Sequence, residues 1–219
     1  MSAYDLVIFD CDGVLIESET IAYKVESRLF KELGADITPQ EVGQIYSGTS
    51  GEFMINDVKT RFGIDIDLKD FGEKFNQLFW PMAKAEMKAT PGVIDFIADI
   101  THEHCVCSNS SYQHIINGLE IVGIHTIPQD FCFSAPELGR GKPAPDVYLH
   151  AASSFGARPE KCLVIEDSPS GVSGGVAAGM TVAGYTGGNH IKETHAPRLQ
   201  EAGASFITDD WRIILDHIG

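Results

Sequence analysis

Short apolar runs recur along the chain, and several of them stop abruptly at polar residues. An apolar run of this length without polar interruption is typical of a parallel-sheet strand that is buried on both faces. The clearest runs are Leu6 to Phe9, Cys105 to Cys107, Phe131 to Ser134, Cys162 to Ile165 and Thr181 to Tyr185. A further edge strand is predicted near the C-terminus, at residues 204–207.

Helical patterns separate these runs in the C-terminal part of the chain. Pro91 and Gly92 open a helix that carries apolar residues on one side, and further helices are expected at residues 111–123, 145–155 and 169–178. Strands and helices that alternate in this way imply right-handed crossovers and a parallel sheet. The predicted fold class is therefore α/β, with a Rossmann-like core.

Between the first and second strands the pattern becomes helical and loses its strand-like runs. Ser18 is a candidate N-cap for the first helix, and Thr38 and Glu41 form a capping-box pattern at the second. The first helix carries a single apolar stripe of Ile21, Val25, Leu29 and Leu33. We interpret residues 16–88 as an inserted helical subdomain, with residues 1–15 and 89–219 forming the core.

Composition limits the function classes further. The 219 residues are 43% hydrophobic, which is enough for a substantial core and excludes a disordered protein. A net charge of -15 with scattered basic residues disfavours nucleic acid as a partner. No leader, membrane-spanning run or Cys-x-x-Cys zinc pattern is visible, and the eight histidines lack ligand spacing. We expect a cytoplasmic protein without membrane partners, as a monomer or weak dimer.

Two carboxylates follow the first strand, in the order Asp10, Cys11, Asp12, Gly13. Ligands of open α/β sheets bind just past the carboxyl ends of the strands, so Asp10 and Asp12 occupy a favourable place for chemistry. An ordinary turn after a strand has the same composition, and the pattern alone leaves both interpretations open.

Three more polar clusters follow in a fixed order. Ser108 ends the second apolar run, Lys142 lies in the segment GRGKPAPD, and Glu166 with Asp167 ends a later run. Together with Asp10-x-Asp12, this set resembles the motifs of the haloacid dehalogenase (HAD) superfamily. Within it the chain is most similar to the branch of sugar-phosphate phosphatases and β-phosphoglucomutases. The resemblance implies a HAD-like core with an inserted helical cap.

The resemblance also implies roles for the acidic residues. Asp10 would attack phosphorus and become an aspartyl phosphate, and Asp12 would act as general acid and then general base. Asp10, the main-chain carbonyl of Asp12, and Asp167 would hold Mg²⁺, with Glu166 as a further ligand or as an acceptor behind it. The same residues also fit a simple helix start before Pro169; the two interpretations can hold together, and the other motifs favour the metal role.

Phosphate binding is expected from the remaining motifs. Ser108 and the main-chain amides of Asn109 and Ser110 lie where a strand becomes a helix, although an ordinary N-cap would look the same. Lys142 would offset the charge of the transferring phosphoryl group. A lone lysine beside prolines is usually a solvated loop residue, but the segment GKPAPD matches a motif of the family and favours the catalytic role. Four glycines that match the family are interpreted as close helix packing: Gly171, Gly174, Gly175 and Gly179.

The loop of Ser47, Gly48, Thr49 and Ser50 breaks the cap helices, and we expect it to contact the substrate. β-Phosphoglucomutases carry a Lys, an Arg and a His where this chain has Ser47, Gly51 and Ala22, which favours hydrolysis over mutase chemistry. The prediction is a Mg²⁺-dependent phosphatase of small phosphorylated metabolites, sugar or sugar-acid phosphates. A mutase, and less favourably a catalytically idle binding protein, are the alternatives.

Overall fold

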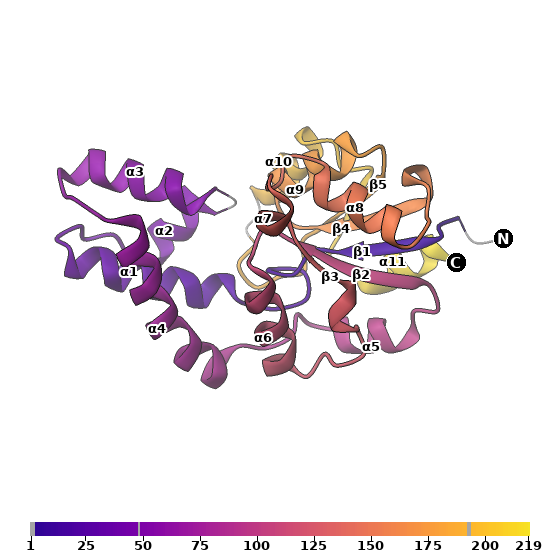
Figure 1. Cartoon of the computed structure of the whole chain (residues 1–219), viewed down its shortest axis with the longest axis horizontal. Helices are drawn as coiled ribbons and strands as arrows, with labels where there is room; N and C mark the ends of the chain where they lie inside the picture. The colour runs from indigo at the N-terminus through magenta and orange to yellow at the C-terminus, as the bar shows by residue number, and fades with distance from the viewer. Residues whose placement is uncertain (1–2, 48, 192–193) are drawn as a thin grey trace. The chain divides into compact units, whose positions relative to one another are not determined.

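The computed structural model describes residues 3–47, 49–191 and 194–219, and these divide into two compact units (Figure 1). The core unit contains residues 1–17 and 88–219, and the helical unit contains residues 18–87. The helical unit therefore starts two residues later and ends one residue earlier than the predicted cap of 16–88.

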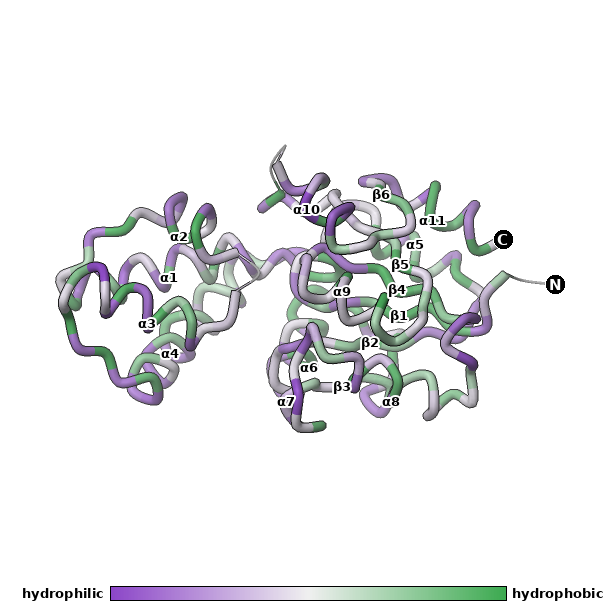
Figure 2. Tube along the Cα trace, turned by 90° about the horizontal axis from the view of Figure 1, so that it is seen from above, coloured by the Kyte–Doolittle hydropathy of each residue, from purple (hydrophilic) through white to green (hydrophobic). Residues whose placement is uncertain are grey.

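A parallel sheet of six strands in the order β3-β2-β1-β4-β5-β6 forms the centre of the core unit. The strands are β1 (Leu6–Phe9), β2 (Glu103–Ser108), β3 (Cys132–Ser134), β4 (Cys162–Glu166), β5 (Thr181–Tyr185) and β6 (Phe206–Thr208). Figure 2 shows β1, β4 and β5 as hydrophobic segments within this unit. β1 and β4 are fully buried, as their uninterrupted apolar runs predict.

Helices cover both faces of this sheet. They are α5 (Val93–Asp99), α6 (Tyr112–Val122), α7 (Ala135–Leu138), α8 (Asp146–Ser154), α9 (Pro169–Ala177), α10 (His195–Glu201) and α11 (Trp211–Ile218), with 3-10 turns at Gln129–Phe131 and Pro159–Lys161. Tyr148 of α8 and Val172 of α9 pack with Ile8 in one core cluster. On the other face, Phe9 contacts Phe96 of α5 and Trp211 of α11. The short helix α7 was not predicted.

The topology explains why the site lies where it does. β1 pairs with β2 on one side and with β4 on the other, and the chain changes direction across the sheet at this point. Ligands of doubly wound sheets bind at such a switch, beyond the carboxyl ends of the strands. The residues that follow β1, β2 and β4 therefore meet at one edge of the sheet.

The helical unit is built from four helices. They are α1 (Glu19–Glu32), α2 (Pro39–Tyr46), α3 (Gly51–Phe62) and α4 (Leu68–Glu86). Thr38 and Glu41 form the predicted capping box, with both reciprocal hydrogen bonds present. Ser18 is the N-cap residue of α1, as predicted, but its side chain makes no capping hydrogen bond. Phe30 and Phe71 stack between α1 and α4 with ring centroids 5.1 Å apart.

The two chain segments that join the units pair with each other. Ile16 and Ala89 form an antiparallel bridge, and the Glu17 amide donates to the Lys88 carbonyl over 2.9 Å. The segment that leaves the core unit and the segment that returns to it are thus hydrogen-bonded to each other. Among the described residues, no helix has the length and hydropathy that crossing a membrane requires.

Candidate active site

Lys142 is the centre of a buried polar cluster at the carboxyl edge of the sheet. Its Nζ donates to Asp10 Oδ1 at 2.5 Å, to Glu166 Oε1 at 2.7 Å and to the Cys107 carbonyl at 2.8 Å. The side chain is 2% exposed, so these hydrogen bonds are shielded from water. The ends of β1, β2 and β4 thus all contact one ammonium group, which comes from the loop between α7 and α8.

Glu166 is occupied by the protein on both carboxylate oxygens. Oε1 accepts from Lys142 and from the Tyr148 hydroxyl, and Oε2 accepts from the Ser168 amide and the Ser168 hydroxyl. A carboxylate offers about four lone-pair sites. With four protein donors around it, Glu166 is suited to holding Lys142 in place more than to binding a ligand.

The charges of the cluster influence one another strongly. Burial raises the pKa of the Asp10 carboxyl well above its ordinary value, and Lys142 opposes this rise. Burial disfavours the Lys142 ammonium, but the Asp10 and Glu166 carboxylates outweigh that effect and raise its pKa. Lys142 therefore remains a cation, and the charge of Asp10 depends on nearby positive charge.

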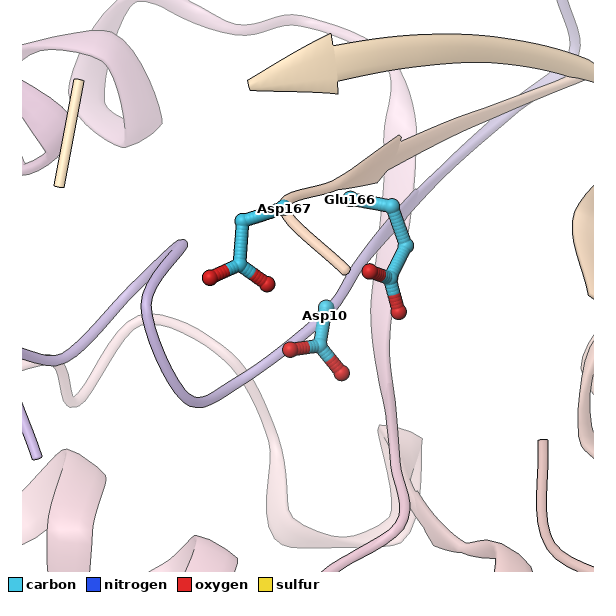
Figure 3. Close-up of side chains that lie close together, drawn as sticks. All are labelled: Asp10, Glu166 and Asp167. Atoms are coloured by element: carbon cyan, nitrogen blue, oxygen red, sulfur yellow. The ribbon is translucent and has the colours of Figure 1, made fainter. Parts of the chain in front are cut away.

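Asp167 completes a group of three acidic side chains with Asp10 and Glu166. Each offers an oxygen within 4.8 Å of the others, and Figure 3 shows the three side chains lying close together. Asp167 Oδ2 lies 2.8 Å from His190 Nε2, whereas Asp167 Oδ1 and Asp10 Oδ2 have no hydrogen-bond partner in the described chain. Buried carboxylate oxygens fit a hard divalent cation such as Mg²⁺.

Asp12 follows Asp10 by two residues but has different neighbours. Its Oδ2 accepts from the Ser110 hydroxyl at 2.7 Å, and its Oδ1 lies 3.0 Å from His114 Nε2. Among the described residues, the Asp12 carboxylate is not part of the acidic group of Asp10, Glu166 and Asp167. One turn thus directs two carboxylates into separate environments.

Ser108 and Asn109 lie beside the cluster but are engaged with protein groups. Ser108 Oγ accepts from the Ser110 amide at 2.9 Å, so that amide, expected to face phosphate, bonds within its own turn. Asn109 Oδ1 accepts from the Lys142 amide at 2.7 Å, which fixes the main chain of Lys142. The N-cap of α6 is Ser111, three residues beyond Ser108.

The loop at residues 47–50, which we expect to contact the substrate, belongs to the helical unit. Thr49 Oγ1 donates to the Tyr46 carbonyl, and Ser50 accepts from the Phe53 amide as the N-cap of α3. Ser47 ends α2, and Gly48 lies outside the described residues. The substrate contact predicted for this loop stays a prediction.

Two glycines make room for the acidic residues. A Cβ at Gly171 would lie 1.6 Å from Glu166 Oε1, and one at Gly13 would lie 2.0 Å from Asp167 Oδ2. Gly13 also has a φ of +85°, which side-chain-bearing residues rarely adopt. Gly171 therefore leaves the space that the Glu166 carboxylate occupies. Gly175 lies against Val182, which agrees with the predicted close packing of the helix.

Sequence reasoning missed three residues that contact the site. His114 contacts Asp12, His190 contacts Asp167, and Tyr148 donates to Glu166. The histidines have no motif spacing, because each reaches its partner through the fold from a distant part of the chain. Tyr148 follows Lys142 by six residues, and that closeness was the one available signal.

The family described as haloacid dehalogenase-like hydrolase matches residues 4–179. A 6-phosphogluconate phosphatase of Escherichia coli (strain K12) is 29% identical over 202 residues, covering 91% of this chain and 90% of that protein. Hexitol phosphatase A of the same organism is 28% identical over 199 residues, covering 89% of this chain and 86% of that protein.

A similar crystal structure is that of a haloacid dehalogenase-like protein of unknown function from Agrobacterium tumefaciens str. C58. It is 37% identical with a TM-score of 0.87, and the match covers 97% of this chain and 96% of that chain. The similarity thus extends through both units of the chain.

Proposed function

Because the chain belongs to the haloacid dehalogenase-like hydrolases, we propose that it is a Mg²⁺-dependent phosphatase of small phosphomonoesters, sugar or sugar-acid phosphates. The observation that carries this proposal is the separation of two neighbouring carboxylates. Asp10 lies against Lys142, and Asp12 lies against His114 and Ser110. Groups in different surroundings can perform different steps of one reaction.

In the proposed reaction, Asp10 is the nucleophile. An oxygen of its carboxylate forms a bond to phosphorus while the bond from phosphorus to the leaving alkoxide breaks, which yields an aspartyl phosphate. The carboxylate loses no proton in this step, and Lys142 holds it by Oδ1 in a buried position. Lys142 also offsets negative charge on the transferring group.

Asp12 moves the protons. It gives a proton to the departing alkoxide, and then takes a proton from the water that attacks phosphorus in the second step. Cleavage of the bond between phosphorus and Asp10 releases inorganic phosphate and restores the carboxylate. Ser110 and His114 hold one oxygen of Asp12 each, which fixes the direction of the group.

A bound Mg²⁺ would supply the positive charge that lets a phosphate dianion approach the Asp10 carboxylate. Asp10, Asp167 and the main-chain carbonyl of Asp12 would hold it, and Glu166 would stabilise Lys142 behind them. The protein's charge of -15 adds to the need for local cations at a phosphate site. Ser108 and the Asn109 amide would contribute to phosphate binding.

The substrate class is proposed from the relatives and from the helical unit. The two Escherichia coli relatives are named as phosphatases of 6-phosphogluconate and of hexitols. We infer that residues 18–87 act as a cap that excludes water during the reaction. The loop of Ser47, Gly48, Thr49 and Ser50 would contact the leaving group.

Hydrolysis is preferred to mutase chemistry because of three residues in the helical unit. Ala22, Ser47 and Gly51 lack the cationic and imidazole groups that would hold a sugar bisphosphate while it reorients. An idle binding protein is disfavoured because Asp10 and Lys142 are in direct contact.

A panel of phosphorylated sugars, sugar acids and hexitols tests the proposal. We expect inorganic phosphate to be released with Mg²⁺ and not with a chelator, and the Asp10→Asn variant to be inactive while the exposed control Asp130→Asn is active. β-Glucose 1-phosphate separates the alternatives, because a mutase converts it to glucose 6-phosphate and a phosphatase releases phosphate. Inactivity on the whole panel would support the idle protein.

A further inference from the structure

The carboxylate of Asp167 is held differently at its two oxygens. Oδ2 lies 2.8 Å from His190 Nε2 and is covered by Gly13, where an added Cβ would be 2.0 Å away. Oδ1 has no hydrogen-bond partner in the part of the chain that the structure describes. The side chains of Asp167 and His190 are only 7% and 3% exposed, so water does not compete freely for this contact.

His190 is itself fixed by the loop between β5 and α10. The amide of Asn189 donates to both oxygens of Glu17, at 3.0 and 3.1 Å. These bonds anchor the loop to the last core residue before the helical unit. A Cβ at Gly188 would lie 2.8 Å from His190 Cε1, so the ring is closely packed from behind. The ring therefore has little freedom to rotate away from Asp167.

The main chain of Asp167 is held as well. His195 Nε2 contacts the Asp167 carbonyl oxygen, so separate histidines fix the main chain and the carboxylate of this residue. His190 Nε2 is thus in contact with Oδ2, which leaves Oδ1 as the oxygen that the Asp167 carboxylate can offer a cation.

We propose that His190 is a specificity-determining residue that makes the cation site select Mg²⁺ over Ca²⁺, an inference that rests on the proposed Mg²⁺-dependent function. Mg²⁺ takes six ligands in a tight octahedron, and one oxygen per carboxylate satisfies it. Ca²⁺ takes six to eight ligands at longer distances and often binds both oxygens of a carboxylate. By occupying Oδ2, His190 removes the second oxygen that Ca²⁺ would use.

The test is calorimetric titration of Mg²⁺ and of Ca²⁺ into the metal-free full chain, without substrate. In His190→Asn the shorter amide cannot reach Oδ2, and in His190→Phe the ring remains without a donor. Partners of this kind change metal affinity by about 10- to 100-fold, so we expect the ratio of the Ca²⁺ Kd to the Mg²⁺ Kd to fall by about tenfold in both variants. His190→Gln, whose amide reaches the position of Nε2, should keep the wild-type ratio.

His104→Asn is the matched control. His104 is half-buried in the same unit, but it pairs with Val7 near the opposite end of the sheet, so the ratio should not change. Thermal melts in chelator establish whether each variant is folded. If either His190→Asn or His190→Phe does not fold, the other one still tests the inference.

The possible outcomes distinguish a failure of the proposed function from a failure of the inference about His190. A wild-type chain that binds no Mg²⁺ contradicts the proposed function and the inference together. A wild-type chain that binds Mg²⁺, with an unchanged ratio in folded His190→Asn or His190→Phe, overturns the inference alone. An equal fall of the ratio in His104→Asn also overturns it, because the effect would then not arise from the contact with Asp167.

Discussion

Removing the Lys142 ammonium should destabilise the core unit more than any exposed lysine does. In Lys142→Met, the Asp10 and Glu166 carboxylates lose their common donor while remaining buried, with side chains 10% and 1% exposed. Breaking a buried ion pair on one side costs about 3–5 kcal/mol, because a charge is left without compensation. Domains are stable by about 5–15 kcal/mol, so the loss is a large fraction of the total.

The expected pH dependence follows from the pKa of the remaining acids. Burial already raises the pKa of Asp10, and without Lys142 nothing in the cluster opposes that rise. A carboxyl whose pKa is higher in the folded state stabilises the fold when protonated and loses that contribution as the pH increases. The loss in free energy of unfolding caused by Lys142→Met should therefore be larger at about pH 8 than at about pH 5.5.

Urea unfolding in chelator, followed by tryptophan fluorescence, measures this deficit. Lys161→Met is the control, because Lys161 Nζ makes a single hydrogen bond with an exposed main-chain carbonyl, that of Ala3 at 3.1 Å. Its free energy of unfolding should change by less than about 1 kcal/mol. If Lys142→Met also remains within about 0.5 kcal/mol of the wild type near pH 8, the cluster does not depend on its ammonium group as argued.

Three further changes test other parts of the structure. Gly171→Ala should displace Glu166, since the new Cβ would lie 1.6 Å from Oε1, and phosphatase activity should fall while Gly72→Ala, with open space around it, stays active. Tyr148→Phe should lower the free energy of unfolding by about 1.5–3 kcal/mol in a urea titration, because the Glu166 carboxylate loses a donor. Burial raises the pKa of Glu26 from 4.5 to about 8, so the wild type loses stability as pH increases through that range. In urea titrations, Glu26→Gln should then have a larger free energy of unfolding than the wild type above about pH 8, by up to about 5 kcal/mol. The difference should vanish toward acid pH, and an equal difference at all pH values would contradict this.

The sheet was predictable because its strands are buried on both faces. Leu6–Phe9 and Thr181–Tyr185 are observed with the bounds that their apolar runs predicted, and the family and the α/β fold class are confirmed. The four-residue helix α7 was missed, since so short a segment carries no recognisable period.

The site was predictable where a residue directly follows a strand, and at Lys142, where the segment GRGKPAPD carries a family motif. Asp10, Glu166 and Asp167 meet because β1 and β4 are neighbours, and the carboxyl ends of parallel strands share one edge. His114 and His190 reach the site from a helix and from a loop, and nothing local in the sequence fixes where such side chains end. Their contacts depend on tertiary structure, which the pattern of apolar positions does not specify.

The central claim is that substrate phosphorylates Asp10 and that Asp12 is needed to remove the phosphoryl group. Asp12→Asn should slow the attack of water and allow the phosphorylated protein to accumulate during turnover. Rapid quenching with borohydride followed by peptide mass spectrometry should then find the reduced acyl group at residue 10, and Asp10→Asn should give no such product. Modification at another residue, or none while Asp12→Asn still turns over substrate, would contradict the account.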